Sequence, residues 1–215
     1  MNVKRSKIPA NLSDGPQFSD IYKRMQERES LYLSFGFDME KERNWVVEAA
    51  EPIQYPILEA GTGKGYFALA LARKGYRFIS FDLSGEMQKI AELHLHHYGL
   101  GHLAHFIVEN GETLSFKNGS FGTVFSINML HHLENPLRVM DELLRVLVSG
   151  GKLILCDFND KGFAMMNEIH AREGTVHDEG KIRLPAVEDY LQSRGFKLQK
   201  KGSAFQDILI AVSPI

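Results

Sequence analysis

Cysteine is almost missing from this 215-residue chain, which contains Cys156 alone. A single thiol excludes an intramolecular disulfide and any zinc site built from several cysteines. Long hydrophobic runs are missing too, since no stretch approaches the roughly 20 apolar residues that a membrane span requires. The first ten residues carry basic side chains without the apolar stretch of a secretory signal. We therefore expect a cytoplasmic protein with no membrane span.

An excess of charge of one sign is also lacking, because the formal net charge is only -2. Such a chain has no long-range positive field with which to attract nucleic acid, so we expect no nucleic-acid partner. Hydrophobic residues make up 44% and charged residues 24% of the sequence. These values are typical of a globular protein and exclude disorder and coiled coil, and the length suits one well-buried core.

Short apolar runs alternate with amphipathic segments through most of the chain. The predicted strands are Pro56–Ala60, Arg77–Asp82, His105–Glu109, Thr123–Asn128 and Lys152–Asp157. The predicted helices between them are Tyr66–Lys74, Glu86–Tyr98 behind an N-cap at Ser84, and a helix from an N-cap at Asn135 to residues 149–151. Strict alternation predicts parallel strands joined by right-handed crossovers, which is a doubly wound α/β fold.

Both ends of the chain depart from that alternation. A helix over Val187–Arg194 is followed by strands at Phe196–Lys200 and Ile208–Val212, which are too close in sequence for a crossover and so predict an antiparallel pair. Residues 1–20 are polar and predict a flexible lead-in, and residues 21–50 predict a helical cap that is broken near Gly36. The expected domains are therefore this lead-in and cap over 1–50, and a main domain over 51–215 with an insertion at 158–184.

A glycine-rich loop follows the first predicted strand, with the sequence Glu59-Ala-Gly-Thr-Gly-Lys-Gly65. Tyr66 stands where the dinucleotide fingerprint needs its last glycine, and Lys64 is not followed by the Ser or Thr of a phosphate loop. Glu59 would repel a pyrophosphate but attract the ammonium and sulfonium groups of S-adenosylmethionine. Asp82, at the end of the second strand, can accept hydrogen bonds from ribose hydroxyls, or is simply a solvated strand-end carboxylate.

Four successive segments resemble the class I S-adenosylmethionine-dependent methyltransferases, especially the ubiquinone/menaquinone-biosynthesis-like branch (methyltransferase type 11). They are Ile57–Gly65, Phe81–Ser84, Asn110–Phe116 and Gly119–Gly151. The resemblance covers about Ile57 to Phe158 and implies a Rossmann-like sheet of seven strands, mostly parallel, with the last strand antiparallel. It departs from the family at Asn110-Gly111, where Asp-Ala is usual, and at Gly122, where Asp is common.

The resemblance also implies a function and a set of cofactor-binding residues. The function is transfer of the methyl group of S-adenosylmethionine to a small-molecule acceptor by in-line displacement. The implied cofactor-binding residues are Glu59, Gly61, Thr62, Gly63, Asp82, Leu83, Asn110, Gly111 and Asn128. Methyl transfer from a sulfonium requires proximity and alignment more than any fixed catalytic side chain.

His131 is the candidate general base, because it follows the fourth strand at the edge where open α/β sheets bind ligands. Alternatively, His131 and His132 cap or pack against the next helix. No metal site is predicted: His170, His177, Asp178 and Glu179 gather in the insertion, but the spacing of the two histidines matches no compact ligand motif, and a polar loop is the plainer interpretation.

Two further groups of ring side chains are open to alternative interpretations. His94, His96 and His97 crowd the end of a helix, where a solvated face favourable to the helix dipole is expected. Phe18, Tyr22 and Tyr32 either close over the cofactor as a lid or are buried in packing.

Three alternatives to a small-molecule methyltransferase stay open. The same fold could methylate a protein or a nucleic acid, although the segment Asn128–His131 lacks the Pro-Pro-aromatic set typical of exocyclic amine methylation in DNA. It could also bind the cofactor without turnover, since a fold alone does not establish an activity. The acceptor and the oligomeric state are not predicted by the sequence.

Overall fold

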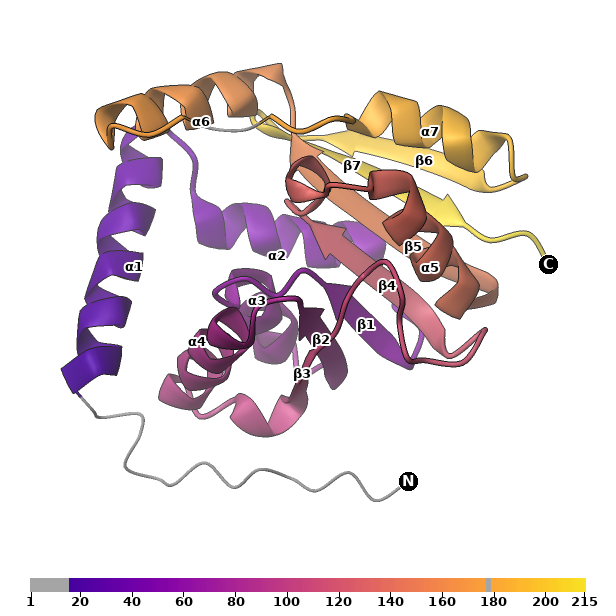
Figure 1. Cartoon of the computed structure of the whole chain (residues 1–215), viewed down its shortest axis with the longest axis horizontal. Coiled ribbons are helices and arrows are strands. Elements are labelled where there is room, and N and C mark those ends of the chain that lie inside the picture. Colours follow the sequence, from indigo (N-terminus) through magenta and orange to yellow (C-terminus); the bar gives the residue numbers. More distant parts are fainter. Residues whose placement is uncertain (1–15, 177–178) are drawn as a thin grey trace.

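A computed structural model describes residues 16–176 and 179–215 of the chain. Its centre is a seven-stranded sheet with the order β3-β2-β1-β4-β5-β7-β6, in which β7 is antiparallel to both of its neighbours and all other pairs are parallel (Figure 1). The strands are β1 (Ile57–Ala60), β2 (Phe78–Asp82), β3 (Ala104–Val108), β4 (Phe121–Ile127), β5 (Leu147–Phe158), β6 (Lys197–Gly202) and β7 (Gln206–Val212). The predicted Rossmann-like sheet with an antiparallel last strand is confirmed.

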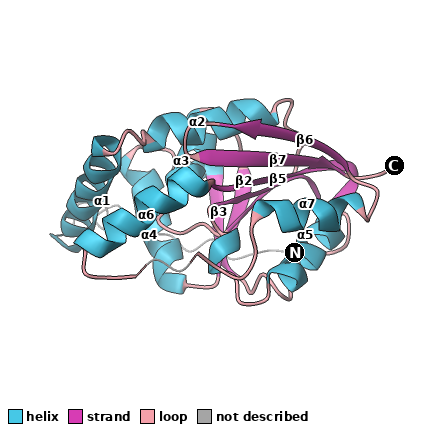
Figure 2. Cartoon of the chain, turned by 90° about the horizontal axis from the view of Figure 1, so that it is seen from above, coloured by secondary structure: helices cyan, strands magenta, loops and turns pink. Residues whose placement is uncertain are grey.

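Helices cover both faces of this sheet and the end at which the parallel strands finish. The helices are α1 (Pro16–Ser34), α2 (Met39–Ala50), α3 (Tyr66–Arg73), α4 (Gly85–His97), α5 (Pro136–Val146), α6 (Asp160–Arg172) and α7 (Leu184–Gln192), with short 3₁₀ turns η1 (Gly101–Leu103) and η2 (Leu130–His132). Figure 2 shows α1 and α6 gathered beyond one end of the sheet. No helix within the described ranges has both the length and the apolar character needed to cross a membrane.

Alternating strand residues feed two separate cores. Ile57, Phe125 and Ile154 point to one face, where they pack against α2, α3 and α4. Their strand neighbours, such as Leu58 and Val124, point to the other face and pack against α5 and α7. Because both faces are covered, the central strands are continuous apolar runs, as expected for a buried parallel sheet.

The N-terminal helical cap is confirmed, with its break between α1 and α2 at Phe35-Gly36, where Gly36 has a φ of 86°. The predicted lead-in is too long, however, because α1 already begins at Pro16 and Phe18 is buried at 4% exposure. Proline suits the first turn of a helix, since the missing N–H would have no partner there. The part of the lead-in over residues 1–15 lies outside the described residues.

The first half of the insertion at 158–184 forms helix α6 (Asp160–Arg172). Asn159 caps α6 by accepting a hydrogen bond from the Gly162 amide at 3.1 Å. Buried Phe163, Met166 and Ile169 follow at helical spacing and join a third apolar cluster that links α6 to the N-terminal cap.

The helix after β4 also differs from the prediction. Asn135 is not its side-chain cap, because its amide donates to Glu112 Oε1 at 2.9 Å instead. The helix ends at Val146, earlier than expected, because Leu147 already pairs with Phe121 and extends β5 toward its N-terminal side. Pro136 does occupy the first turn, as predicted.

Candidate cofactor and active site

A cavity of about 720 Å³ lies at the carboxyl ends of the parallel strands, where open α/β sheets bind ligands. Every predicted cofactor residue lines it: Glu59, Gly61, Thr62, Gly63, Asp82, Leu83, Asn110, Gly111 and Asn128. Segments far apart in the sequence therefore meet around one space of the size that small-molecule ligands require.

The glycine loop uses its backbone amides to hold the neighbouring strand. The amides of Gly61 and Thr62 both donate to Phe81 O, at 2.9 and 3.1 Å, and that of Gly63 donates to the Asp82 carboxylate. The amide of Gly65 donates to Thr62 O at 3.0 Å. A phosphate-binding loop needs such amides aimed at the ligand. This loop therefore does not present the amide cradle that a pyrophosphate requires, as its sequence predicted.

The absence of a side chain matters at two glycines of the loop, Gly61 and Gly63. A Cβ on Gly61 would lie within 3.0 Å of three Met129 side-chain atoms, and Gly63 has a φ of 51° with no atom within 4 Å of the place its Cβ would take. A ligand can therefore approach bare main chain at Gly63.

Asp82 ends β2 with both carboxylate oxygens engaged by the main chain. Oδ2 accepts from the Gly63 amide and Oδ1 from the Ser84 amide, each at 2.9 Å. The carboxylate is therefore held in place, with lone pairs left for ligand hydroxyls. Beside it, Leu83 is 72% exposed and offers an apolar surface to the cavity.

Glu59 lies deeper than the mouth of the loop, at 2% exposure. It accepts a hydrogen bond from the Ser80 hydroxyl at 2.6 Å, and Ser80 in turn is bonded to the Thr62 hydroxyl. Burial raises the pKa of Glu59 to about 8, against the opposing effects of Ser80 and of the Arg43 charge. A nearby cation would stabilise its ionised form, as expected for a residue that faces a positively charged ligand.

The turn after β3 forms another part of the cavity wall. Asn110 Oδ1 accepts a hydrogen bond from the Glu112 backbone amide at 2.9 Å. Gly111 is packed closely, because a Cβ there would lie 3.3 Å from a Val139 methyl. The ring of a ligand can therefore lie against the backbone at Gly111, because a larger side chain at this position would occupy that space.

The predicted base His131 is buried at 2% exposure in η2, and its Nδ1 lies 2.7 Å from Asp157 Oδ1. A carboxylate accepts a hydrogen bond, so Nδ1 of His131 is the donor in this contact. His132, and not His131, is among the residues that line the cavity. The structure therefore separates the two histidines, and the base role of His131 stays a prediction.

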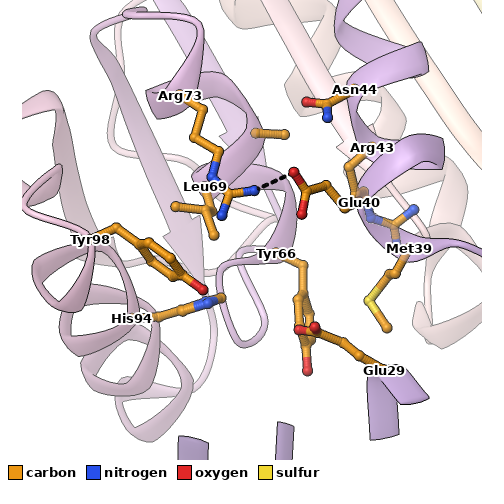
Figure 3. A pocket seen from close by; sticks show the side chains of 11 residues that line it. Glu29, Met39, Glu40, Arg43, Asn44, Tyr66, Leu69, Arg73, His94 and Tyr98 are labelled. Carbon is orange, nitrogen blue, oxygen red and sulfur yellow. Dashed lines mark ion pairs between the residues drawn. The ribbon is translucent and has the colours of Figure 1, made fainter. Parts of the chain in front are cut away.

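Among the lining residues that the sequence did not assign to the site are Arg43 of α2 and Tyr66 of α3. Arg43 is buried at 8% exposure, and burial lowers its pKa. Both residues also border a small cavity of about 50 Å³ between α1, α2, α3 and α4, where Glu29 and His94 join them (Figure 3). The Tyr66 hydroxyl is buried there without a hydrogen-bond partner in the described chain. Both residues occur in ordinary helical patterns, so no local signal marked them.

Known proteins resemble the chain in sequence and in fold. A family model described as a methyltransferase domain matches residues 58–155. A ubiquinone biosynthesis O-methyltransferase from Xanthomonas axonopodis is 27% identical over 164 residues, which are 72% of this chain and 68% of that protein. Another from Paracidovorax citrulli is 27% identical over 206 residues, 88% and 85% of the two chains. This chain belongs to the class I S-adenosylmethionine-dependent methyltransferases.

The fold of the methyltransferase agrees with this membership. A crystal structure of a S-adenosylmethionine-dependent methyltransferase from Aquifex aeolicus superposes with a TM-score of 0.65 at 18% identity, covering 88% of this chain and 97% of that one. At this level of identity the likeness concerns the fold alone.

The two groups of ring side chains with alternative interpretations, one of histidines in α4 and one of aromatic residues in α1, do not line the cofactor cavity of the methyltransferase. His94 is buried at 2% exposure and bonded through Nδ1 to Lys64 O at 3.0 Å, so the predicted solvated face is wrong for this residue but holds for His96 and His97. Burial lowers the pKa of His94 to about 4. The packing alternative is right for Phe18, which contacts the His97 ring with centroids 5.9 Å apart.

Some of the other residues singled out in the sequence lie within the described chain and some do not. Tyr32 is buried at 8% exposure and packs edge-on against Phe37. Tyr22 bonds the Tyr98 hydroxyl at 2.8 Å, which ties α1 to α4. His170 Nδ1 lies 2.9 Å from the Thr175 hydroxyl. Its proposed companions His177 and Asp178 lie outside the described residues.

Proposed function

We propose that this methyltransferase transfers the methyl group of S-adenosylmethionine to a small-molecule acceptor by in-line displacement. The observation that carries the proposal is the combination, in one cavity, of loop amides already bonded to β2 with the Asp82 carboxylate and with Glu59, whose ionised form a bound cation would stabilise. Such a site disfavours a pyrophosphate and favours an adenosyl cation.

The chain's residues fit the separate parts of this cofactor. Asp82 is held so that it can accept from the ribose hydroxyls, and Leu83 offers an apolar surface to the adenosine. Gly111 would leave room for the adenine ring, and the Asn110 side chain would be available to bind it. Arg43 is a buried cation suited to the carboxylate of the methionine part.

When bound, S-adenosylmethionine supplies a methyl group already activated by its sulfonium. The protein residues therefore need only align the two reactants and exclude water. Helices α1 and α6 cover this edge of the sheet, and Arg28 of α1 bonds Glu173 at the end of α6 at 3.0 Å. His131 is proposed as the base that removes a proton from the acceptor, with Asp157 setting its tautomer.

A small-molecule acceptor is supported by the names of the related ubiquinone biosynthesis O-methyltransferases and by the net charge of -2. We propose no nucleic-acid partner, because the chain has no overall positive charge with which to bind phosphates.

Calorimetric titration tests the proposal. S-adenosylmethionine and S-adenosylhomocysteine should bind the purified protein, whereas NAD and ATP should not. Formation of S-adenosylhomocysteine should then accelerate with one member of an acceptor panel that begins with catechols. Binding of a nucleotide in preference to both sulfur ligands would contradict the cofactor, and binding without acceleration by any acceptor would contradict the turnover.

A further inference from the structure

A buried chain of side chains joins the helical cap to the end of β4. Arg43 NH1 donates to Gln206 Oε1 at 3.2 Å, and Gln206 Nε2 donates to Asn128 Oδ1 at 2.6 Å. Gln206 is 0% exposed. Arg43 and Asn128 both line the cofactor cavity, and Gln206 lies behind them as their shared partner.

The chemistry of these groups sets the direction of every hydrogen bond in the chain. A guanidinium only donates, so the atom of Gln206 that faces Arg43 must be its oxygen. The amide nitrogen of Gln206 then faces Asn128, whose oxygen must accept from it. The Nδ2 group of Asn128 is consequently turned away from Gln206 and remains a donor.

Within the described parts of the chain, Asn128 Nδ2 donates to no protein acceptor. This nitrogen is also not fully buried, so it is not a buried polar atom without a partner. Asn128 lines the cavity, so the group is available to a ligand there. Its backbone supports the arrangement: Asn128 is the only non-glycine residue with a positive φ, 52°, among the described residues. Asparagine tolerates this conformation better than most side chains.

We propose that Gln206 is a positioning residue that fixes the Asn128 amide, so that the site selects a ligand presenting an oxygen acceptor at the end of β4. This inference rests on the proposed function. The oxygen belongs either to the carboxylate of the cofactor or to the methyl acceptor. In both cases the site discriminates against a group that could only donate a hydrogen bond.

The antiparallel last strand is what brings Gln206 to this position. Gln206 is the first residue of β7 and pairs with Phe158, the last residue of β5. A parallel strand would begin at the far edge of the sheet, away from the cavity. Ser203 makes a second connection between the cap and the start of β7. Its hydroxyl donates to Glu42 Oε2 at 2.7 Å and accepts from the backbone amide of Gln206 at 3.0 Å.

Gln206→Glu tests this positioning with little change in shape. A carboxylate still accepts from Arg43 but has no proton for Asn128, so the Asn128 amide must reverse and present its oxygen to the cavity. We expect affinity for S-adenosylhomocysteine to fall about tenfold or more, while affinity for methylthioadenosine, which lacks the amino-acid part, is retained. Gln199→Glu, at an exposed position of β6, is the charge-matched control.

If the oxygen belongs to the methyl acceptor, both adenosyl ligands keep their affinity and catechol, used as the probe, loses binding to the S-adenosylhomocysteine complex. Equal losses for S-adenosylhomocysteine and methylthioadenosine would assign Gln206 a structural role and overturn the inference, as would no change in any titration. A wild-type protein that binds neither adenosyl ligand would instead refute the proposed function.

Asn128→Asp provides an independent check, because it leaves an acceptor for Gln206 and places a second acceptor toward the cavity. It should reproduce the selective loss seen with Gln206→Glu.

Discussion

The carboxylate of Asp82 accepts a hydrogen bond from the Gly63 amide at 2.9 Å, which connects the end of β2 to the loop after β1. The residue proposed to hold the ribose thus also holds the loop that the ligand must approach. Positioning and binding depend on the same carboxylate.

Asp82→Ala should lower the affinity for S-adenosylhomocysteine by about 1 to 3 kcal/mol, because the ribose hydrogen bonds are lost and the Gly63 amide is released. Isothermal titration calorimetry measures this directly. Asp189→Ala, an exposed carboxylate on α7, removes the same charge away from the cavity and should leave affinity unchanged. Equal affinity of the Asp82 variant and the wild type would refute the assignment of the site.

Glu59 should make the unliganded protein less stable as the pH rises from its ordinary value of 4.5 to about 8. In that interval the folded protein retains a proton on Glu59 that the unfolded chain has released, so the free energy of unfolding falls with pH. Glu59→Gln removes this contribution. The melting temperature of the variant minus that of the wild type should therefore increase between pH 5 and pH 8, and a constant difference would contradict the raised pKa.

His94 should destabilise the protein in acid, with the opposite sign. Its pKa of about 4 lies below the ordinary 6.5 because the ring is buried. Between these values the unfolded chain binds a proton that the folded protein does not, so stability falls as the pH drops. Urea titrations at pH 4.5 and 7 should show a smaller loss for His94→Gln than for the wild type. His96→Gln, exposed on the same helix, should behave like the wild type.

His131→Gln should lower kcat by about 100-fold, with unchanged affinity for S-adenosylhomocysteine, if the ring acts as the base. The matched comparison is His132→Gln, which changes the adjacent ring that lines the cavity. Steady-state kinetics with the identified acceptor measures both. A larger loss in the His132 variant would transfer the role to that residue.

Gly65→Ala should destabilise the fold more than Gly75→Ala. Both glycines have a φ of 81°, so each variant bears the cost of a left-handed alanine, about 1 to 2 kcal/mol. At Gly65 the new Cβ would also lie 2.9 Å from the Cβ of Ala91, whereas at Gly75 it would meet nothing within 4 Å. Denaturant unfolding should show a further loss of about 1 to 3 kcal/mol at Gly65, from overpacking. Equal losses would mean that α4 yields without cost.

The order of the elements, the glycine loop and the placement of Asp82 could be read from the sequence because each depends on local patterns. Alternating apolar runs and helical segments allow few topologies, and parallel strands bring their carboxyl ends to a common edge. Glu59, Asp82 and Asn128 stand at or just beyond the ends of the neighbouring strands β1, β2 and β4 and therefore meet there. Their chemical types then indicated the kind of ligand.

Arg43 and Gln206 could not be found in this way, since 163 positions separate them and neither stands in a motif. Their contact depends on β7 running antiparallel beside β5 and on the cap docking above it. The conformation of the 3₁₀ turn η2 likewise buries the side chain of His131 and leaves that of His132 to line the cavity. Local sequence sets the conformation of each element, but partners across elements are chosen by sheet order, register and packing, because these interactions form only when distant segments are brought together.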